Sequence, residues 1–179
     1  GPGDLIIRVQ RCGICGTDLH MTKGHDFQFP AGSTPGHEVA GEVVAMGKDV
    51  SSWKTGDRLT ALPSTGCGHC TSCKHGNWTL CRNAPGQMGG FAEYMRVAAP
   101  TAVRLPSSLS AADGAMVEPL AVGLYGVRQS NIGPGSKVLV LGGGSVALCA
   151  IWWARALGAS KIVAASRSER RAELALAMG

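Results

Sequence analysis

Four cysteines stand close together in the run GCGHCTSCKHGNWTLC, at Cys67, Cys70, Cys73 and Cys81. Their spacing, C-x2-C-x2-C-x7-C, allows one loop to direct four thiolates at a single tetrahedral centre, which is the geometry and ligand type that zinc accepts. Four thiolates leave no position for water, so the spacing predicts a closed, structural zinc lobe over about residues 66–82. Disulfides are the alternative, although cysteines this close pair poorly in a tight loop. An iron–sulfur cluster is a further alternative, but the spacing differs from the ferredoxin pattern.

A second set of metal-binding side chains is divided between two segments. Cys15 lies in CGICGTDLH, and His37 and Glu38 follow Gly36. One thiolate, one imidazole and one carboxylate fit a catalytic zinc that keeps a position open for substrate. The alternative is structural, with Cys15 as a small buried side chain and His37 as a hydrogen-bonded core histidine.

A glycine-rich turn follows the apolar run KVLVL and has the form Gly142-x-Gly144-x-x-Ala147. In a strand–turn–helix unit, the first glycine permits a tight turn and the second lets a pyrophosphate approach the backbone. The third position needs only a small residue. The phosphate would lie at the N-terminus of the following helix. The pattern predicts a dinucleotide-binding turn.

The end of the next apolar run bears on the choice of cofactor. An NAD site usually has an acidic residue there, to accept the ribose 2′-hydroxyl. Here Ser166 and Arg167 occupy this place, and the first acid is Glu169. A hydroxyl followed by a guanidinium suits a 2′-phosphate, which favours NADP over NAD. The alternative is that Arg167 is an ordinary solvated residue at a helix start.

The elements that must position these residues change in character along the chain. Strands are predicted at 4–10, 37–46 and 58–62 and in the alternating run FAEYMRV. A helix capped by Ser110 and interrupted at Pro119 follows. Then come a fully buried strand at 137–141, a helix at 145–157, a strand at 161–165 and a helix at 168–178. This last alternation implies a parallel sheet with right-handed crossovers.

Composition agrees with a globular enzyme. The 179 residues are 45% hydrophobic and 16% charged, which is enough apolar material for a core. The net charge of +5 is scattered, so nucleic-acid binding is not indicated. The uncharged stretch 138–154 has three glycines near its start, which favours a strand turning into a helix over a membrane span. The N-terminus shows no secretory signal, and we expect a cytoplasmic protein.

Several motifs together carry a family resemblance. GICGTDLH, PGHEVAGEV, WKTGDRL, the four-cysteine lobe, GGFAEYM, VEPLAVGL and KVLVLGGGSVAL occur in this order. The chain resembles the zinc-dependent medium-chain alcohol and polyol dehydrogenases over nearly its whole length. Where the alcohol dehydrogenases of the family have a third ligand cysteine, this chain has Glu118. With a glutamate at this position, the chain resembles the polyol and threonine dehydrogenase branch of the family.

The resemblance implies a GroES-like β-barrel domain over residues 1–119, followed over 120–179 by the first part of a Rossmann domain. It implies Cys15 and His37 as ligands of a catalytic zinc, completed by Glu38 or Glu118 directly or through water. Thr17 and His20 would carry the released proton to solvent, although a surface histidine such as His20 often has no such role. Cys12 and Cys149 match no ligand position and are interpreted as packing residues.

The activity implied is reversible oxidation of a secondary alcohol or polyol, with hydride passing to NADP or, less favoured, NAD. Two zinc ions per chain are expected, one catalytic and one structural, and the full-length protein is expected to be a homodimer or homotetramer. Family members run to roughly twice this length, so we expect either a fragment that is inactive alone or a protein that has lost activity. The rival hypothesis is a catalytically silent or quinone-reductase-like zinc protein used for binding or assembly.

Overall fold

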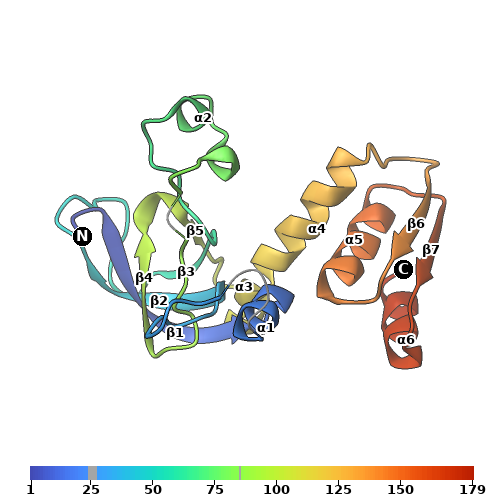
Figure 1. The fold of residues 1–179 in the computed structure, drawn as a ribbon, viewed down its shortest axis with the longest axis horizontal. Helices are drawn as coiled ribbons and strands as arrows, with labels where there is room; N and C mark the ends of the chain where they lie inside the picture. The colour runs from blue at the N-terminus through green and yellow to red at the C-terminus, as the bar shows by residue number, and fades with distance from the viewer. Residues whose placement is uncertain (24–27, 85) are drawn as a thin grey trace. The chain divides into compact units, whose positions relative to one another are not determined.

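The computed structural model describes residues 1–23, 28–84 and 86–179, which separate into two compact units, Gly1–Glu118 and Pro119–Gly179. In chain order the first unit contains β1 (Asp4–Gly13), α1 (Gly16–Thr22), β2 (Glu38–Met46), β3 (Arg58–Ala61), α2 (Thr71–Lys74), the 3₁₀ helix η1 (Trp78–Leu80), β4 (Tyr94–Ala98), the 3₁₀ helix η2 (Ala99–Thr101), β5 (Ala102–Arg104) and α3 (Ala111–Ala115). Helix α4 (Val117–Gln129) begins at the end of this unit. It is followed by β6 (Lys137–Leu141), α5 (Ser145–Ala156), β7 (Lys161–Ala165) and α6 (Glu169–Met178) (Figure 1).

The first unit is built on a five-stranded antiparallel sheet of order β4-β1-β2-β3-β5. Alternation along β1 shows how the sequence selects a face, because Leu5 and Ile7 are fully buried while Ile6 and Arg8 are exposed. The buried side chains of four strands form one core, made of Leu5, Ile7, Val39, Val43, Leu59, Ala61, Met95 and Val97. This core packs β1 and β2 together. The candidate site lies where the end of β1 pairs with the start of β2.

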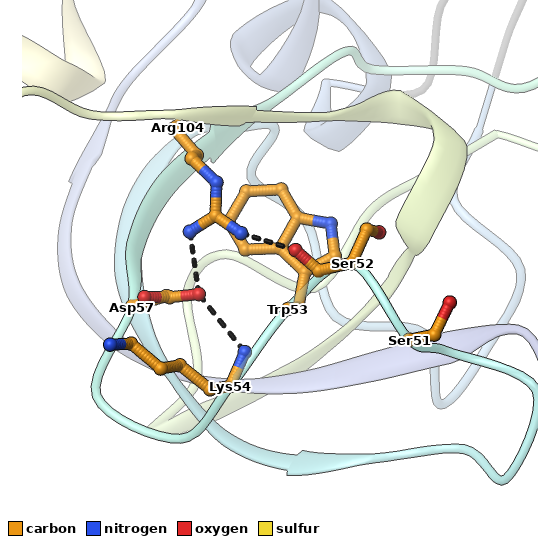
Figure 2. A pocket seen from close by; sticks show the side chains of 6 residues that line it. All are labelled: Ser51, Ser52, Trp53, Lys54, Asp57 and Arg104. Atoms are coloured by element: carbon orange, nitrogen blue, oxygen red, sulfur yellow. Dashed lines mark hydrogen bonds and ion pairs between the residues drawn. The ribbon is translucent and has the colours of Figure 1, made fainter.

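Strand β5 is a short edge strand that a cluster of polar contacts holds in place. The Arg104 guanidinium donates to the Asp57 carboxylate at 2.5 Å and to the Ser52 carbonyl, and it lies 4.3 Å from the centre of the Trp53 ring. Figure 2 shows these side chains around a cavity of about 440 Å³. Because the guanidinium is already engaged by an acid, a carbonyl and an aromatic ring, we interpret the cluster as a clamp on the edge of the sheet.

The described residues from Ser64 to Ala84 leave the sheet, and the chain returns to it at Gly86. Ser64 and Gly86 form an antiparallel bridge, and the Gln87 N–H donates to the Pro63 carbonyl at 2.7 Å. The excursion contains α2, η1 and the four cysteines of the predicted lobe. The two ends of this excursion therefore lie next to each other where it joins the sheet.

In the second unit, β6 and β7 pair in parallel, from Lys137 opposite Lys161 to Leu141 opposite Ala165. Helix α5 connects them, as parallel pairing requires, and packs against α4, where the Trp153 indole N–H donates to the Leu120 carbonyl at 2.8 Å. The predicted strand–helix–strand–helix order is confirmed. No helix within the described ranges is both long and apolar enough to cross a bilayer.

Two predictions about local structure were wrong. The helical stretch does not break at Pro119 but at Met116, which ends α3, and Pro119 lies in the first turn of α4. A proline is tolerated there because the first-turn N–H groups have no partner within the helix. Strand β6 is also not fully buried: Leu139 and Leu141 are 62% and 78% exposed. Alternate side chains of β6 lie on opposite faces of a two-stranded sheet, and one of these faces is left open.

Five short elements were not predicted, and one strand starts late. Helix α1 follows Cys15 directly, β5 has only three residues, and α2, η1 and η2 are single short turns of helix. The run FAEYMRV pairs only from Tyr94 onward, so β4 begins three residues after Phe91.

Candidate functional site

The four lobe cysteines come together around one point. Cys70 caps the short helix α2, Cys73 lies within it, and Cys81 follows η1. The four Sγ atoms all lie within 4.8 Å of one another. Cys67 Sγ is 3.9 Å from Cys73 Sγ, and Cys70 Sγ is 3.8 Å from Cys81 Sγ. Zn–S bonds of about 2.3 Å in a tetrahedron place sulfur atoms about 3.8 Å apart, so this donor set fits zinc.

The backbone of the lobe prepares one of these thiols for ionisation. The N–H groups of His69 and then Cys70 lower the pKa of Cys67 to about 6. Burial has the opposite effect on Cys73, whose pKa rises to about 12 because the desolvation of a thiolate outweighs the hydrogen bond from the Gly68 backbone. A dication at the centre would favour the thiolate at both positions. The chemistry of the lobe therefore agrees with a closed metal site.

The second set of metal-binding side chains is assembled by α1 and β2. Cys15 is the residue immediately before α1, His37 is the residue immediately before β2, and Glu38 is the first residue of that strand. One donor atom from each lies within 4.8 Å of the others, and the side chains of His37 and Glu38 are buried. His37 Nδ1 is buried without a hydrogen-bond partner among the described residues. A buried polar group of this kind is costly unless it finds a partner, so these three donors fit a metal ion.

Gly13 explains how Glu38 reaches this position. A Cβ atom on residue 13 would lie 2.1 Å from Glu38 Oε2, so the carboxylate occupies space that any other residue would fill. Residue 13 pairs with residue 38 across β1 and β2, which holds the two in register. Gly13, the first glycine of the motif CGICG, therefore has a packing role at the site.

Asp18 is a site residue that the sequence reasoning missed. Its carboxylate is 2% exposed and accepts from the Cys15 N–H at 2.9 Å and from the Gly36 N–H at 3.3 Å. The same carboxylate lies 3.6 Å from His37 Nδ1. It therefore joins the Cys15 segment to the His37 segment. Asp18 lies three residues after the capping residue Cys15, so the sequence could have indicated its capping role but not its contact with Gly36.

The remaining residues predicted for this site have different surroundings. Glu118 lies in the first turn of α4 and is half-buried. Desolvation raises the pKa of its carboxyl, His37 opposes this effect, and Glu38 adds to it. The charges of His37 and Glu38 therefore act on Glu118, although Glu118 is not among the three close donors Cys15, His37 and Glu38. Thr17 and His20 are exposed on α1, one turn apart.

The two other cysteines outside the lobe are not among the grouped donors. Burial is the main cause that raises the pKa of the Cys12 thiol, to about 11. Cys12 Sγ would be 2.6 Å from a Cβ on Gly90, so the thiol packs against backbone. Cys149 is buried in α5. These positions agree with the interpretation of both as packing residues.

The glycine turn of the second unit has the expected local shape. Gly142 has φ +131°, a conformation that favours glycine, and Gly144 is the residue before α5. A Cβ on Gly142 would lie 3.7 Å from Ala147 Cβ, so a larger third residue would meet the turn. A cavity of about 560 Å³ borders this turn, and its lining includes Ser166 and Arg167. Ser168 and Arg171 also line it, and the sequence reasoning did not name them.

Comparison with known proteins agrees with these observations. The sequence model of the alcohol dehydrogenase GroES-like domain matches residues 1–107. The chain belongs to the zinc-dependent medium-chain dehydrogenase family. The predicted fold class, a GroES-like domain followed by the beginning of a Rossmann domain, is thereby confirmed.

Individual relatives include polyol dehydrogenases. The chain is 35% identical to sorbitol dehydrogenase of Bacillus subtilis, covering 98% of the chain and 52% of that protein. It is 34% identical to L-idonate 5-dehydrogenase of Vitis vinifera, covering 100% of the chain and 51% of the relative. Among solved structures, a zinc-binding dehydrogenase from Sinorhizobium meliloti 1021 bound to NADP is 40% identical, with a TM-score of 0.94, and covers 100% of this chain and 53% of that one. The chain thus spans about half the length of the dehydrogenases it matches.

Proposed function

We propose that the protein to which this chain belongs is a zinc-dependent oxidoreductase that transfers a hydride between a secondary alcohol or polyol and NADP. One observation carries the proposal: a cysteine, a histidine and a glutamate at the starts of α1 and β2 have donor atoms within 4.8 Å of one another. Three protein donors leave one coordination position of a zinc ion open for a substrate, whereas the four cysteines of the lobe would fill every position. Sorbitol and L-idonate, the compounds in the names of two relatives, both carry secondary hydroxyl groups, which supports the same reaction class.

Cys15, His37 and either Glu38 or Glu118 would hold the catalytic zinc, and the lobe cysteines would hold the structural one. A zinc ion at the first site would supply a Lewis acid that polarises the substrate oxygen. The protein's own contribution is to hold the donors in position. Asp18 does this by accepting from two backbone N–H groups and facing His37. Free thiols suit a reducing compartment such as the cytoplasm.

Proton movement is assigned to Thr17 and His20. Both are exposed on α1, within three residues of each other, so they share one side of the helix. A hydroxyl followed by an imidazole can pass a proton from a closed site toward solvent. NADP is preferred to NAD in this proposal because Ser166 and Arg167 stand where an acid would be needed for NAD.

The rival hypothesis is a catalytically silent zinc protein. The test uses the full-length protein that contains this chain, assayed for metal content and for NADP reduction with a panel of secondary alcohols and polyols. Cys15→Ser should abolish turnover and remove one zinc per chain. Cys12→Ser is the matched control, since Cys12 is nearby but outside the donor group, and it should retain both zinc ions and turnover. Absence of turnover from a wild-type protein carrying two zinc ions would support the silent protein.

A further inference from the structure

The backbone immediately before His37 is held by hydrogen bonds with two other segments. Gly36 has φ +93°, in the region that favours glycine. Its N–H donates to the Asp18 carboxylate at 3.3 Å. Its carbonyl accepts from the N–H groups of Gly89, at 3.1 Å, and Gly90, at 2.9 Å. Both polar groups of the residue before the candidate ligand are therefore engaged.

The last residue of the segment 89–91 adds a further bond. The Phe91 N–H donates to the Pro35 carbonyl at 3.0 Å, so the three successive N–H groups of residues 89–91 donate to two successive carbonyls. A peptide unit is planar, and its six atoms move together. Holding the carbonyl oxygen of Gly36 therefore also fixes where the Cα atom of His37 lies. The segment 89–91 thus determines the point from which the imidazole leaves the backbone.

Gly90 allows these two backbones to approach each other. The residue is buried. A Cβ atom there would lie 2.6 Å from Cys12 Sγ, 3.1 Å from the Gly36 oxygen and 3.2 Å from the Gly36 carbonyl carbon. The first of these distances is too short for a Cβ atom, and the other two are tight. A side chain at residue 90 would therefore push the segment 89–91 away from the carbonyl that it holds.

The imidazole of His37 depends on this support. Its Nδ1 is buried and has no hydrogen-bond partner among the described residues, so this atom does not fix the orientation of the ring by a bond of its own. The backbone that carries the ring must then supply the orientation. Asp18 holds the N–H of Gly36 and the segment 89–91 holds its carbonyl, so the two contacts act at opposite ends of one residue.

We propose that Gly90 is a positioning residue for the three-donor site. It lets the segment 89–91 hold the peptide unit before His37 and thereby directs the imidazole toward the other two donors. The inference rests on the proposed catalytic zinc and adds to it an element that belongs to neither α1 nor β2. Contacts that orient metal ligands from outside typically change metal affinity about 10- to 100-fold when they are lost.

The test compares metal binding by the wild-type and Gly90→Ala forms of the full-length protein that contains this chain. A chelator of known affinity competes for the zinc, and metal analysis counts the ions that remain. We expect Gly90→Ala to lower the zinc affinity of the three-donor site about 10- to 100-fold, while the lobe keeps its zinc. Co²⁺ placed in the three-donor site should also show shifted visible absorption bands, because these depend on the geometry of the ligands.

Gly86→Ala is the matched control. Gly86 lies four residues earlier in the chain, and a Cβ atom there would lie 4.0 Å from Met88 Cγ, which is an ordinary contact. This variant should keep both the zinc affinity and the cobalt bands of the wild type. Adding Cys12→Ala to Gly90→Ala removes the sulfur that the new Cβ atom would meet. The double variant should therefore recover part of the lost affinity.

Wild-type zinc affinity and cobalt bands in a folded Gly90→Ala protein would overturn the positioning role and leave the three-donor site in place. Loss of the lobe zinc to the same extent as the other zinc would also overturn it, because Gly90 would then support the fold as a whole. A wild-type protein that binds zinc only in the lobe would overturn the proposed catalytic zinc instead.

Discussion

Gln87 joins three parts of the first unit through one buried amide, and its removal should have a large effect on stability. The residue is 1% exposed. Its Nε2 donates to the Leu62 carbonyl at 2.6 Å and to Thr101 Oγ1 at 2.7 Å, and its Oε1 accepts from the Ala98 N–H at 2.5 Å. The amide therefore ties the base of the cysteine lobe to the end of β4 and to η2.

Gln87→Ala removes all three bonds. Each is worth about 1 kcal/mol net, and a buried group left without a partner adds more, so the free energy of unfolding should fall by about 3–5 kcal/mol. That is a large part of the 5–15 kcal/mol typical of a folded domain. Urea unfolding followed by circular dichroism would measure the loss. Hydrogen exchange should locate it in β3 and β4, with β6 and β7 in the other unit still protected.

Gln10→Ala is the control for this prediction. Gln10 lies in the same sheet, and its Nε2 makes one longer bond, of 3.4 Å, to Glu42. Its replacement should cost less than about 1 kcal/mol. If Gln87→Ala also cost less than about 1 kcal/mol, or if β6 and β7 lost protection to the same extent, the role assigned to the amide would be wrong.

Three further predictions concern other parts of the chain. In the full-length protein, Glu118→Ala should reduce turnover by about 100-fold or more while metal analysis still finds the lobe zinc; near-normal turnover would transfer the role to Glu38. Cys81→Ser should lower the thermal midpoint and the zinc content by one ion per chain, since structural zinc contributes on the order of 10 kcal/mol in small modules; two retained zinc ions would contradict this. The Arg104 guanidinium holds the pKa of Asp57 below its ordinary value of 3.8, so the stability gained is present above pH 3.8 and lost as the pH falls through the lowered pKa. In Asp57→Asn, the thermal midpoint should therefore fall less steeply as the pH is lowered. Equal slopes of midpoint against pH in mutant and wild type would refute the linkage.

The features that the sequence could predict are those specified by local pattern. The cysteine spacing is contained in 15 residues, and the run KVLVL with its glycines is contiguous, so both could be interpreted without knowledge of the fold. Asp18 was missed because its importance depends on Gly36, which the sheet brings close from another segment. Strand β5 was missed because three residues carry no periodicity, and only its pairing with β3 makes it a strand.

Exposure was the least predictable property. Leu139 lies in an apolar run, and such a run does not reveal how many layers cover the strand. The contact of Arg171 with Gly143 was also beyond the sequence, because a turn and a helix 28 residues apart meet only after the sheet has formed. Metal binding by the two clusters and cofactor binding by the residues near the glycine turn remain predictions, which the geometry of the donor atoms supports.

The meeting of Ser64 and Gly86 at one bridge makes the cysteine lobe a removable insertion. The strand before it and the segment after it are already adjacent, so a short turn could replace residues 65–85 without altering the register of the sheet. Closing a shorter loop costs less conformational entropy, and the Gln87 amide would still seal the junction. The same geometry makes this point a suitable acceptor for foreign sequences: a peptide or small domain whose ends lie close together could be grafted here, with the sheet as its platform.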